Sequence, residues 1–174
     1  MGRFFSPSQK SLAKESFAQA EKLAGQFFRL SSESLRSHRY DIRTLAYLEK
    51  HEVNETAFAH LCKYQYQNEN TDEAGFHFYR ICLQDNCILD AIDRAGSFIK
   101  LSPLMLYIAV HELTHVIRFD SGLVDFDAPL EVKREEEERV NRITREMLRA
   151  VRFPDLNMVF ECFSKDYQIG EIYN

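Results

Sequence analysis

The feature that most constrains this chain of 174 residues is His111-Glu112-Leu113-Thr114-His115, set inside the apolar run from Leu104 to Phe119. Residues four apart lie one turn apart on the same face of a helix, so both imidazoles can face one metal ion. Glu112 lies about 100° further round, from where its carboxylate can reach a water molecule bound to that ion. The motif predicts a zinc site with His111 and His115 as ligands and Glu112 as general base.

The residues before the motif favour a helix. Ser102-Pro103 is typical of a helix start, because serine caps the first turn and proline there has no N–H that needs a partner. Leu104, Ile108, His111 and His115 then recur along one stripe, which directs the histidines inward. The alternative is a buried helix whose two histidines only hydrogen-bond within the core.

A zinc site needs at least one more protein ligand. No histidine follows His115, and the only later cysteine is Cys162, so a carboxylate is the simplest third ligand. Residues 132–151 contain neither Pro nor Gly and carry apolar residues at helical spacing, namely Val140, Ile143, Met147 and Val151. In that helix Glu136 and Glu137 project over or beside the apolar stripe, whereas Glu135 and Glu138 are expected in solvent. Periodicity leaves both Glu136 and Glu137 as candidate ligands.

A helix with H-E-x-x-H, followed roughly twenty to thirty residues later by a helix with a glutamate ligand, resembles the gluzincin group of zinc metallopeptidases. Within this group, the run from Glu137 to Asn141, continued by Met147-Leu148 and Pro154, is similar to the E-x-x-A-N…L-L-x-P signature of ImmA/IrrE-type peptidases. The resemblance covers residues 103–154. It implies one Zn²⁺ ion with Glu137 as its third ligand, and Asn141 as a neighbouring support residue.

The ligand set predicts a zinc-dependent metallopeptidase, an endopeptidase suited to a regulatory role, that hydrolyses a bond in a peptide or protein substrate. Such a site also needs a donor to the tetrahedral oxyanion, for which Tyr167, Tyr173 and Arg142 are the candidates. Two alternatives remain. One is a catalytically silent, metal-stabilised protein-binding module, and the other is a helical interaction module without metal.

The predicted fold class is α+β, mainly α, with a zincin-like core. A single domain over 1–174 would comprise an N-terminal helical subregion (1–70), the catalytic core (74–160) and a C-terminal tail (161–174). Aromatic and β-branched residues predict strands at 76–83 and 87–92, joined by a turn at 84–86 into a small antiparallel sheet before the H-E-x-x-H helix. An exposed edge of this hairpin could bind an extended peptide; equally, both strands could simply cover the helix.

Three helices are expected before the sheet. Ser6-Pro7 begins the first, and Ser31 marks a break or a new cap. Residues 40–50 predict the second helix. Asn54 is the expected cap of the third, which runs to Tyr66, and residues 67–73 form the best internal linker.

Composition supports a cytoplasmic protein that folds without disulfides. The chain is 45% hydrophobic and lacks a signal peptide or a membrane span, and its four cysteines form no C-x-x-C pair. The net charge of −5 argues against nucleic-acid binding. A modest basic patch could attract an acidic partner but is better interpreted as solvated surface; it comprises Arg29, Arg36, His38, Arg39 and Arg43. Neither nucleic acid nor membrane is an expected partner, and the oligomeric state is left open.

Overall fold

Helices make up most of the residues that the structure describes. The computed structural model describes residues 3–65, 77–96, 99–153, 155–163 and 170–172. The helices are α1 (Pro7–Phe27), α2 (Ser32–Ser37), α3 (Asp85–Ala95), α4 (Leu101–Asp120), α5 (Leu130–Arg149) and α6 (Leu156–Phe163). The strands are β1 (Tyr40–Arg43), β2 (Ala59–Gln65), β3 (His77–Leu83) and β4 (Gly170–Ile172). The predicted class, α+β and mainly α, is confirmed.

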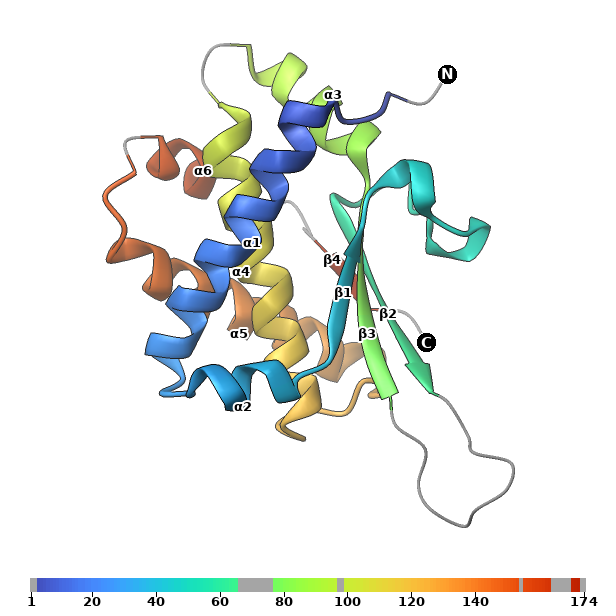
Figure 1. The fold of residues 1–174 in the computed structure, drawn as a ribbon, viewed down its shortest axis with the longest axis vertical. Coiled ribbons are helices and arrows are strands. Elements are labelled where there is room, and N and C mark those ends of the chain that lie inside the picture. The colour runs from blue at the N-terminus through green and yellow to red at the C-terminus, as the bar shows by residue number, and fades with distance from the viewer. Residues whose placement is uncertain (1–2, 66–76, 97–98, 154, 164–169, 173–174) are drawn as a thin grey trace.

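The strands form one sheet in the order β1-β3-β2-β4. β1 and β3 are parallel, β2 and β3 are antiparallel, and β2 and β4 are parallel. The sheet is therefore mixed, whereas the sequence predicted an antiparallel one. Helices α1, α4, α5 and α6 lie on one side of it (Figure 1). The last strand comes from the segment expected to be a tail.

Helix α4 lies at the centre of the molecule. It contacts α1, α3, α5, α6 and β2, and every residue from Pro103 to Phe119 is buried. This complete burial explains why the segment is apolar on all sides. The predicted helix is confirmed, and it begins at Leu101, one residue before the expected cap, with Pro103 still inside the first turn.

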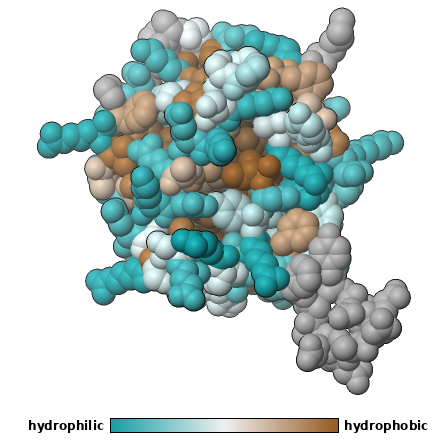
Figure 2. Space-filling view, viewed as in Figure 1, coloured by the Kyte–Doolittle hydropathy of each residue, from teal (hydrophilic) through white to brown (hydrophobic). Residues whose placement is uncertain are grey.

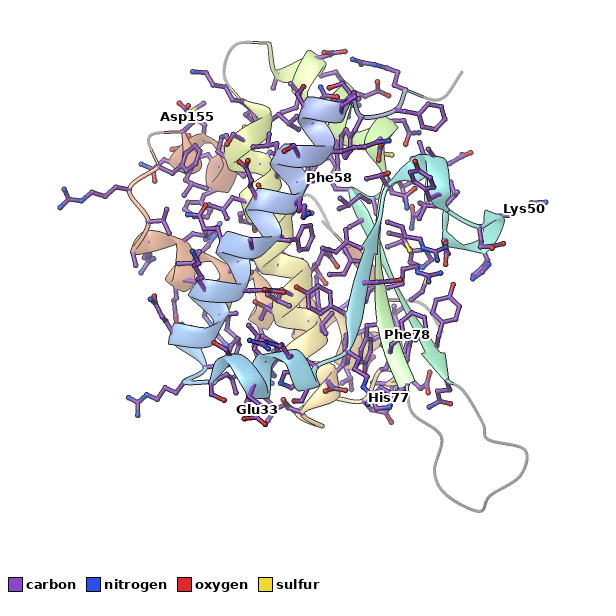
Figure 3. The ribbon with its side chains drawn as sticks, in the orientation of Figure 1. Glu33, Lys50, Phe58, His77, Phe78 and Asp155 are labelled. Atoms are coloured by element: carbon purple, nitrogen blue, oxygen red, sulfur yellow. The ribbon has the colours of Figure 1, made fainter. Side chains whose placement is uncertain are left out.

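The C-terminal end of α4 is attached to the sheet through Asp120. Its Oδ2 lies 2.7 Å from Nδ1 of His38, just before β1, and its Oδ1 lies 2.7 Å from Nε2 of His77, the first residue of β3. Figure 3 shows His77 at the lower end of that strand. One carboxylate therefore connects the central helix to the starts of two parallel strands.

The first and last long helices agree with the sequence prediction. Ser6 caps α1 in a reciprocal capping box with Gln9, and the Ser31 side chain caps α2. The segment predicted at 132–151 is α5, which begins two residues earlier, at Leu130. Glu135 and Glu138 are exposed on it, as expected.

Two predicted N-terminal helices are wrong. Residues 40–50 contain β1 and a 3₁₀ turn at Leu45–Tyr47, and a second 3₁₀ turn begins at Lys50. The strand forms because Tyr40 and Ile42 alternate with Asp41 and Arg43 in the period of a strand. The segment from Asn54 to Tyr66 contains β2. Asn54 does accept backbone N–H bonds, from Thr56 at 2.8 Å and Ala57 at 3.2 Å, but it caps a turn and not a helix. The linker predicted at 67–73 lies outside the described residues.

Of the two strands predicted for the hairpin, the first is confirmed and the second is wrong. The strand expected at 76–83 is β3, although Phe76 is not described, and its antiparallel partner is β2. Residues 87–92 belong to helix α3, in which Ile88, Leu89 and Ala91 are buried at helical spacing. The turn cannot form because Asp85 already begins the helix, where its carboxylate accepts bonds from the backbone N–H groups of Phe5 and Leu45.

Candidate metal centre

The H-E-x-x-H motif lies in the middle of α4, as predicted. His111 and His115 are one turn apart, and their Nε2 atoms are 3.1 Å from each other. Both side chains are buried, with 0% and 1% of their surface exposed. Two ring nitrogens thus meet at one point inside the protein.

A carboxylate from α5 completes this cluster. Glu137 Oε1 lies 2.8 Å from His111 Nε2, and its Oε2 lies 3.0 Å from His115 Nε2. One candidate ligand atom from each of the three residues lies within 4.8 Å of the other two. The structure therefore brings together the three residues predicted as zinc ligands.

Glu136, the other candidate from periodicity, points to a different partner. Its carboxylate accepts hydrogen bonds from the Arg118 guanidinium, through Nε and, at 3.2 Å, through Nη2. Both residues are buried, and the pair connects α4 to α5 three residues beyond His115. Sequence reasoning missed Arg118, although a lone arginine inside an apolar run is a signal that a buried partner is needed.

Breaking this ion pair is expected to destabilise the fold. In Arg118→Met the buried Glu136 carboxylate would keep, among the described residues, the half-exposed side chain of Arg139, whose Nη1 is 3.8 Å away. We expect the free energy of unfolding, measured in urea, to fall by about 3–5 kcal/mol. Arg118→Met/Glu136→Leu should recover most of that loss, because it leaves no buried charge. A loss below about 1 kcal/mol in the single variant would contradict the buried-pair interpretation.

Each of the two imidazoles stacks on one aromatic ring of α4. Tyr107 stacks on His111, with ring centroids 6.1 Å apart, and Phe119 stacks on His115 at 5.8 Å. The Tyr107 hydroxyl donates a 3.2 Å hydrogen bond to Oδ1 of Asn141 on α5. Asn141, the support residue implied by the family resemblance, thus lies one turn from the cluster and binds the ring that orients His111. Tyr107 and Phe119 were not found from the sequence.

Several buried polar atoms at the centre have no partner among the described residues. They include both carboxylate oxygens of Glu112 and the Nδ1 atoms of His111 and His115. Buried polar groups are normally satisfied, so such a concentration of orphaned atoms marks a site for ions or water. The donor set of two imidazoles and a carboxylate suits zinc, and the residues fit the metal that the motif predicts.

The ionisable groups of the cluster shift one another's pKa values. Burial raises the pKa of Glu112, although His111 and His115 oppose this shift. Burial would also raise the pKa of Glu137, but the same two histidines outweigh it and hold that pKa well below its usual range. Glu137 is therefore an anion at neutral pH, the form that binds a metal ion.

Of the three predicted oxyanion donors, the structure describes only Arg142. Arg142 is exposed on α5 and lies beside Glu138, Arg145 and Glu146. Tyr167 and Tyr173 lie outside the described residues. Glu112 is fully buried, whereas Glu137 is 8% exposed and marks the side of the cluster nearest to solvent.

A large cavity lies elsewhere, between α1, α2 and β1. It has a volume of about 1090 Å³, and Arg36, His38 and Arg39 of the predicted basic patch line it. Figure 2 shows hydrophobic side chains gathered between α1 and the sheet within a largely hydrophilic face. None of the three candidate ligands lines this cavity.

Comparisons with known protein families, curated proteins and solved structures find no match to this chain. The gluzincin resemblance therefore stays a prediction that depends on the motif. Among the described helices, none combines the length and the apolar character needed to cross a bilayer.

Proposed function

We propose that this protein is a cytoplasmic zinc-dependent endopeptidase with a zincin-like core, acting on a peptide or protein substrate. The observation that supports this function is the convergence of His111, His115 and Glu137, beside a Glu112 carboxylate that has no hydrogen-bond partner in the described part of the chain. A buried helix that needed its histidines only for packing would not require a second helix to direct a carboxylate between them.

The residues divide the chemistry among them. A zinc ion held by His111, His115 and Glu137 would polarise the scissile carbonyl and lower the pKa of a bound water towards about 7. Glu112 accepts a proton from the attacking water and delivers it to the leaving amine as the peptide bond breaks. Its burial suits this role, because a carboxyl with a raised pKa is a stronger base than one in water.

The test is a joint measurement of metal content and cleavage. Protein purified without an affinity tag should contain one zinc per chain and cleave members of a mixed peptide library. Chelation should abolish cleavage, and added zinc should restore it. A chain that lacks zinc, and does not take it up, would instead be a helical interaction module.

A metal-stabilised binding module without turnover is the second candidate. The complete burial of Glu112 favours it, because a scissile peptide bond must reach the water that this carboxylate activates before any reaction. This function predicts bound zinc and a lower melting temperature after chelation, together with an uncleaved peptide library.

A further inference from the structure

A second cluster of reactive side chains lies on the face of the sheet opposite α4. Leu61 and Ile81 are register partners that belong to the apolar core. Because side chains alternate along a strand, the neighbouring His60 and Cys62 on β2 and Cys82 on β3 point to the other face. In the register His60 is opposite Cys82, and Cys62 is the diagonal neighbour of that residue.

The thiol of Cys62 is in contact with two hydrogen-bonding groups. Its Sγ lies 3.9 Å from Nδ1 and 4.0 Å from Nε2 of His60, and the thiol of Cys82, which donates to the Arg80 carbonyl oxygen at 3.8 Å, is its other neighbour. Cys82 is fully buried, whereas Cys62 is 7% exposed. The two cysteines therefore differ in position, because Cys82 lies behind the cluster and Cys62 at its open side.

A cavity of about 640 Å³ leads to Cys62. His60 and Tyr64 line it together with Cys62. The thiol and its neighbouring imidazole thus border a space that a small molecule can enter.

The surrounding charges favour the thiolate. The neighbouring Cys82 thiol and the His60 imidazole outweigh burial and the opposing Glu52 carboxylate, and lower the pKa of Cys62. The pKa of Cys82 moves in the opposite direction, so this thiol keeps its proton. The negative charge of Glu52 is compensated by Arg80, whose Nη1 donates a 2.9 Å hydrogen bond to Oε1 of Glu52.

We propose that Cys62 is a nucleophilic thiolate, with His60 as its counter-ion, and that it is a site of covalent modification by small uncharged electrophiles entering this cavity. In the reaction the sulfur lone pair forms a bond to the electrophilic atom, and the leaving group departs with its own electron pair. With iodoacetamide an S–C bond forms and a C–I bond breaks, so that iodide leaves. No base is required, because the thiolate has already lost its proton. The proposal does not depend on the hydrolase function.

The test is the pH dependence of alkylation of the folded, full-length protein by iodoacetamide, followed at each cysteine by peptide mass spectrometry. Glutathione in the same solution serves as an ordinary thiol, whose thiolate fraction rises about 75-fold between pH 6 and pH 8. The rate at Cys62 should change less than about twofold over this range. This ratio is independent of how accessible the thiol is. Exposed Cys162 reports that the reagent reacts with the chain.

Two variants test the origin of the thiolate. In His60→Gln and in Cys82→Ala, the rate at Cys62 should rise with pH and approach the dependence of glutathione. The wild-type profile is decisive by itself if either variant fails to fold. A Cys62 rate that rises in parallel with that of glutathione would overturn the proposal. So would a Cys62 that reacts only after the protein is unfolded.

Discussion

Glu112→Gln is expected to bind zinc with the same stoichiometry as the wild type and to lose peptide cleavage by a factor of about 10²–10⁴ in kcat/KM. The amide has the shape of the carboxylate but cannot accept a proton from water. Since Glu112 is not among the three converging ligands, the substitution leaves the metal site intact. Elemental analysis and a fluorogenic peptide, selected from the library, give the two readouts.

The matched control is Glu135→Gln, which changes an exposed glutamate of α5 to the same amide. It should cleave at the wild-type rate. Equal activity of Glu112→Gln and wild type would exclude Glu112 as the general base. Loss of zinc in Glu112→Gln would instead make this carboxylate a ligand and contradict its assignment.

The stability of the metal-free protein gives an independent check on Glu112. Burial raises the pKa of this carboxyl, so the folded chain binds its proton more tightly than the unfolded chain. The associated stability is present below the ordinary glutamate pKa of about 4.3 and is lost as the pH rises through the folded value. Glutamine has no charge to bury, so metal-free Glu112→Gln should melt at pH 7 no lower than the metal-free wild type.

Glu137→Gln and Glu136→Gln are expected to have opposite effects, although the residues are neighbours in sequence. Glu137→Gln should weaken zinc binding by more than about 100-fold, because loss of even an outer-shell partner of a ligand typically costs 10–100-fold. It should also abolish zinc-dependent stabilisation, which reaches about 2.7 kcal/mol at a zinc concentration 100 times the Kd. Zinc titration and thermal melting with and without zinc measure both effects.

Glu136→Gln should keep the wild-type zinc affinity and lose stability, because Arg118 remains buried opposite an uncharged amide. The two variants are therefore controls for each other. Metal retained in Glu137→Gln but lost in Glu136→Gln would reverse the assignment of the third ligand.

The helices at the centre could be predicted because their signals are local. Pro103 and the apolar run indicate α4, although the predicted cap Ser102 lies inside the helix and Lys100 occupies the cap position. The amphipathic spacing from Val140 to Met147 indicates α5. The choice between Glu136 and Glu137 could not be made from periodicity, because both side chains are buried and each has a partner on α4. The difference depends on where Arg118 and the histidines face α5, which is tertiary information.

The sheet could not be predicted because its pairings are long-range. β2 lacks the alternation of a half-buried strand: Leu61 is buried against the helices, and His60 and Cys62 are buried on the opposite face. Phe58 and Cys62 are four residues apart, which is the spacing of one helix face, and Asn54 is a residue type that often caps helices. In β1, only four residues carry the strand signal, and they pair with residues about forty positions later.

The burial of α4 on all sides has a consequence for how this chain tolerates mutation. A helix at the surface can accept changes on its outer face without harm, but here every residue from Pro103 to Phe119 is buried. Close-packed interiors accept mainly replacements of similar volume and polarity. Most random substitutions along this helix are therefore expected to destabilise the fold, whether or not they alter a residue of the motif. Stability alone thus limits which substitutions this helix, and the motif within it, can accept.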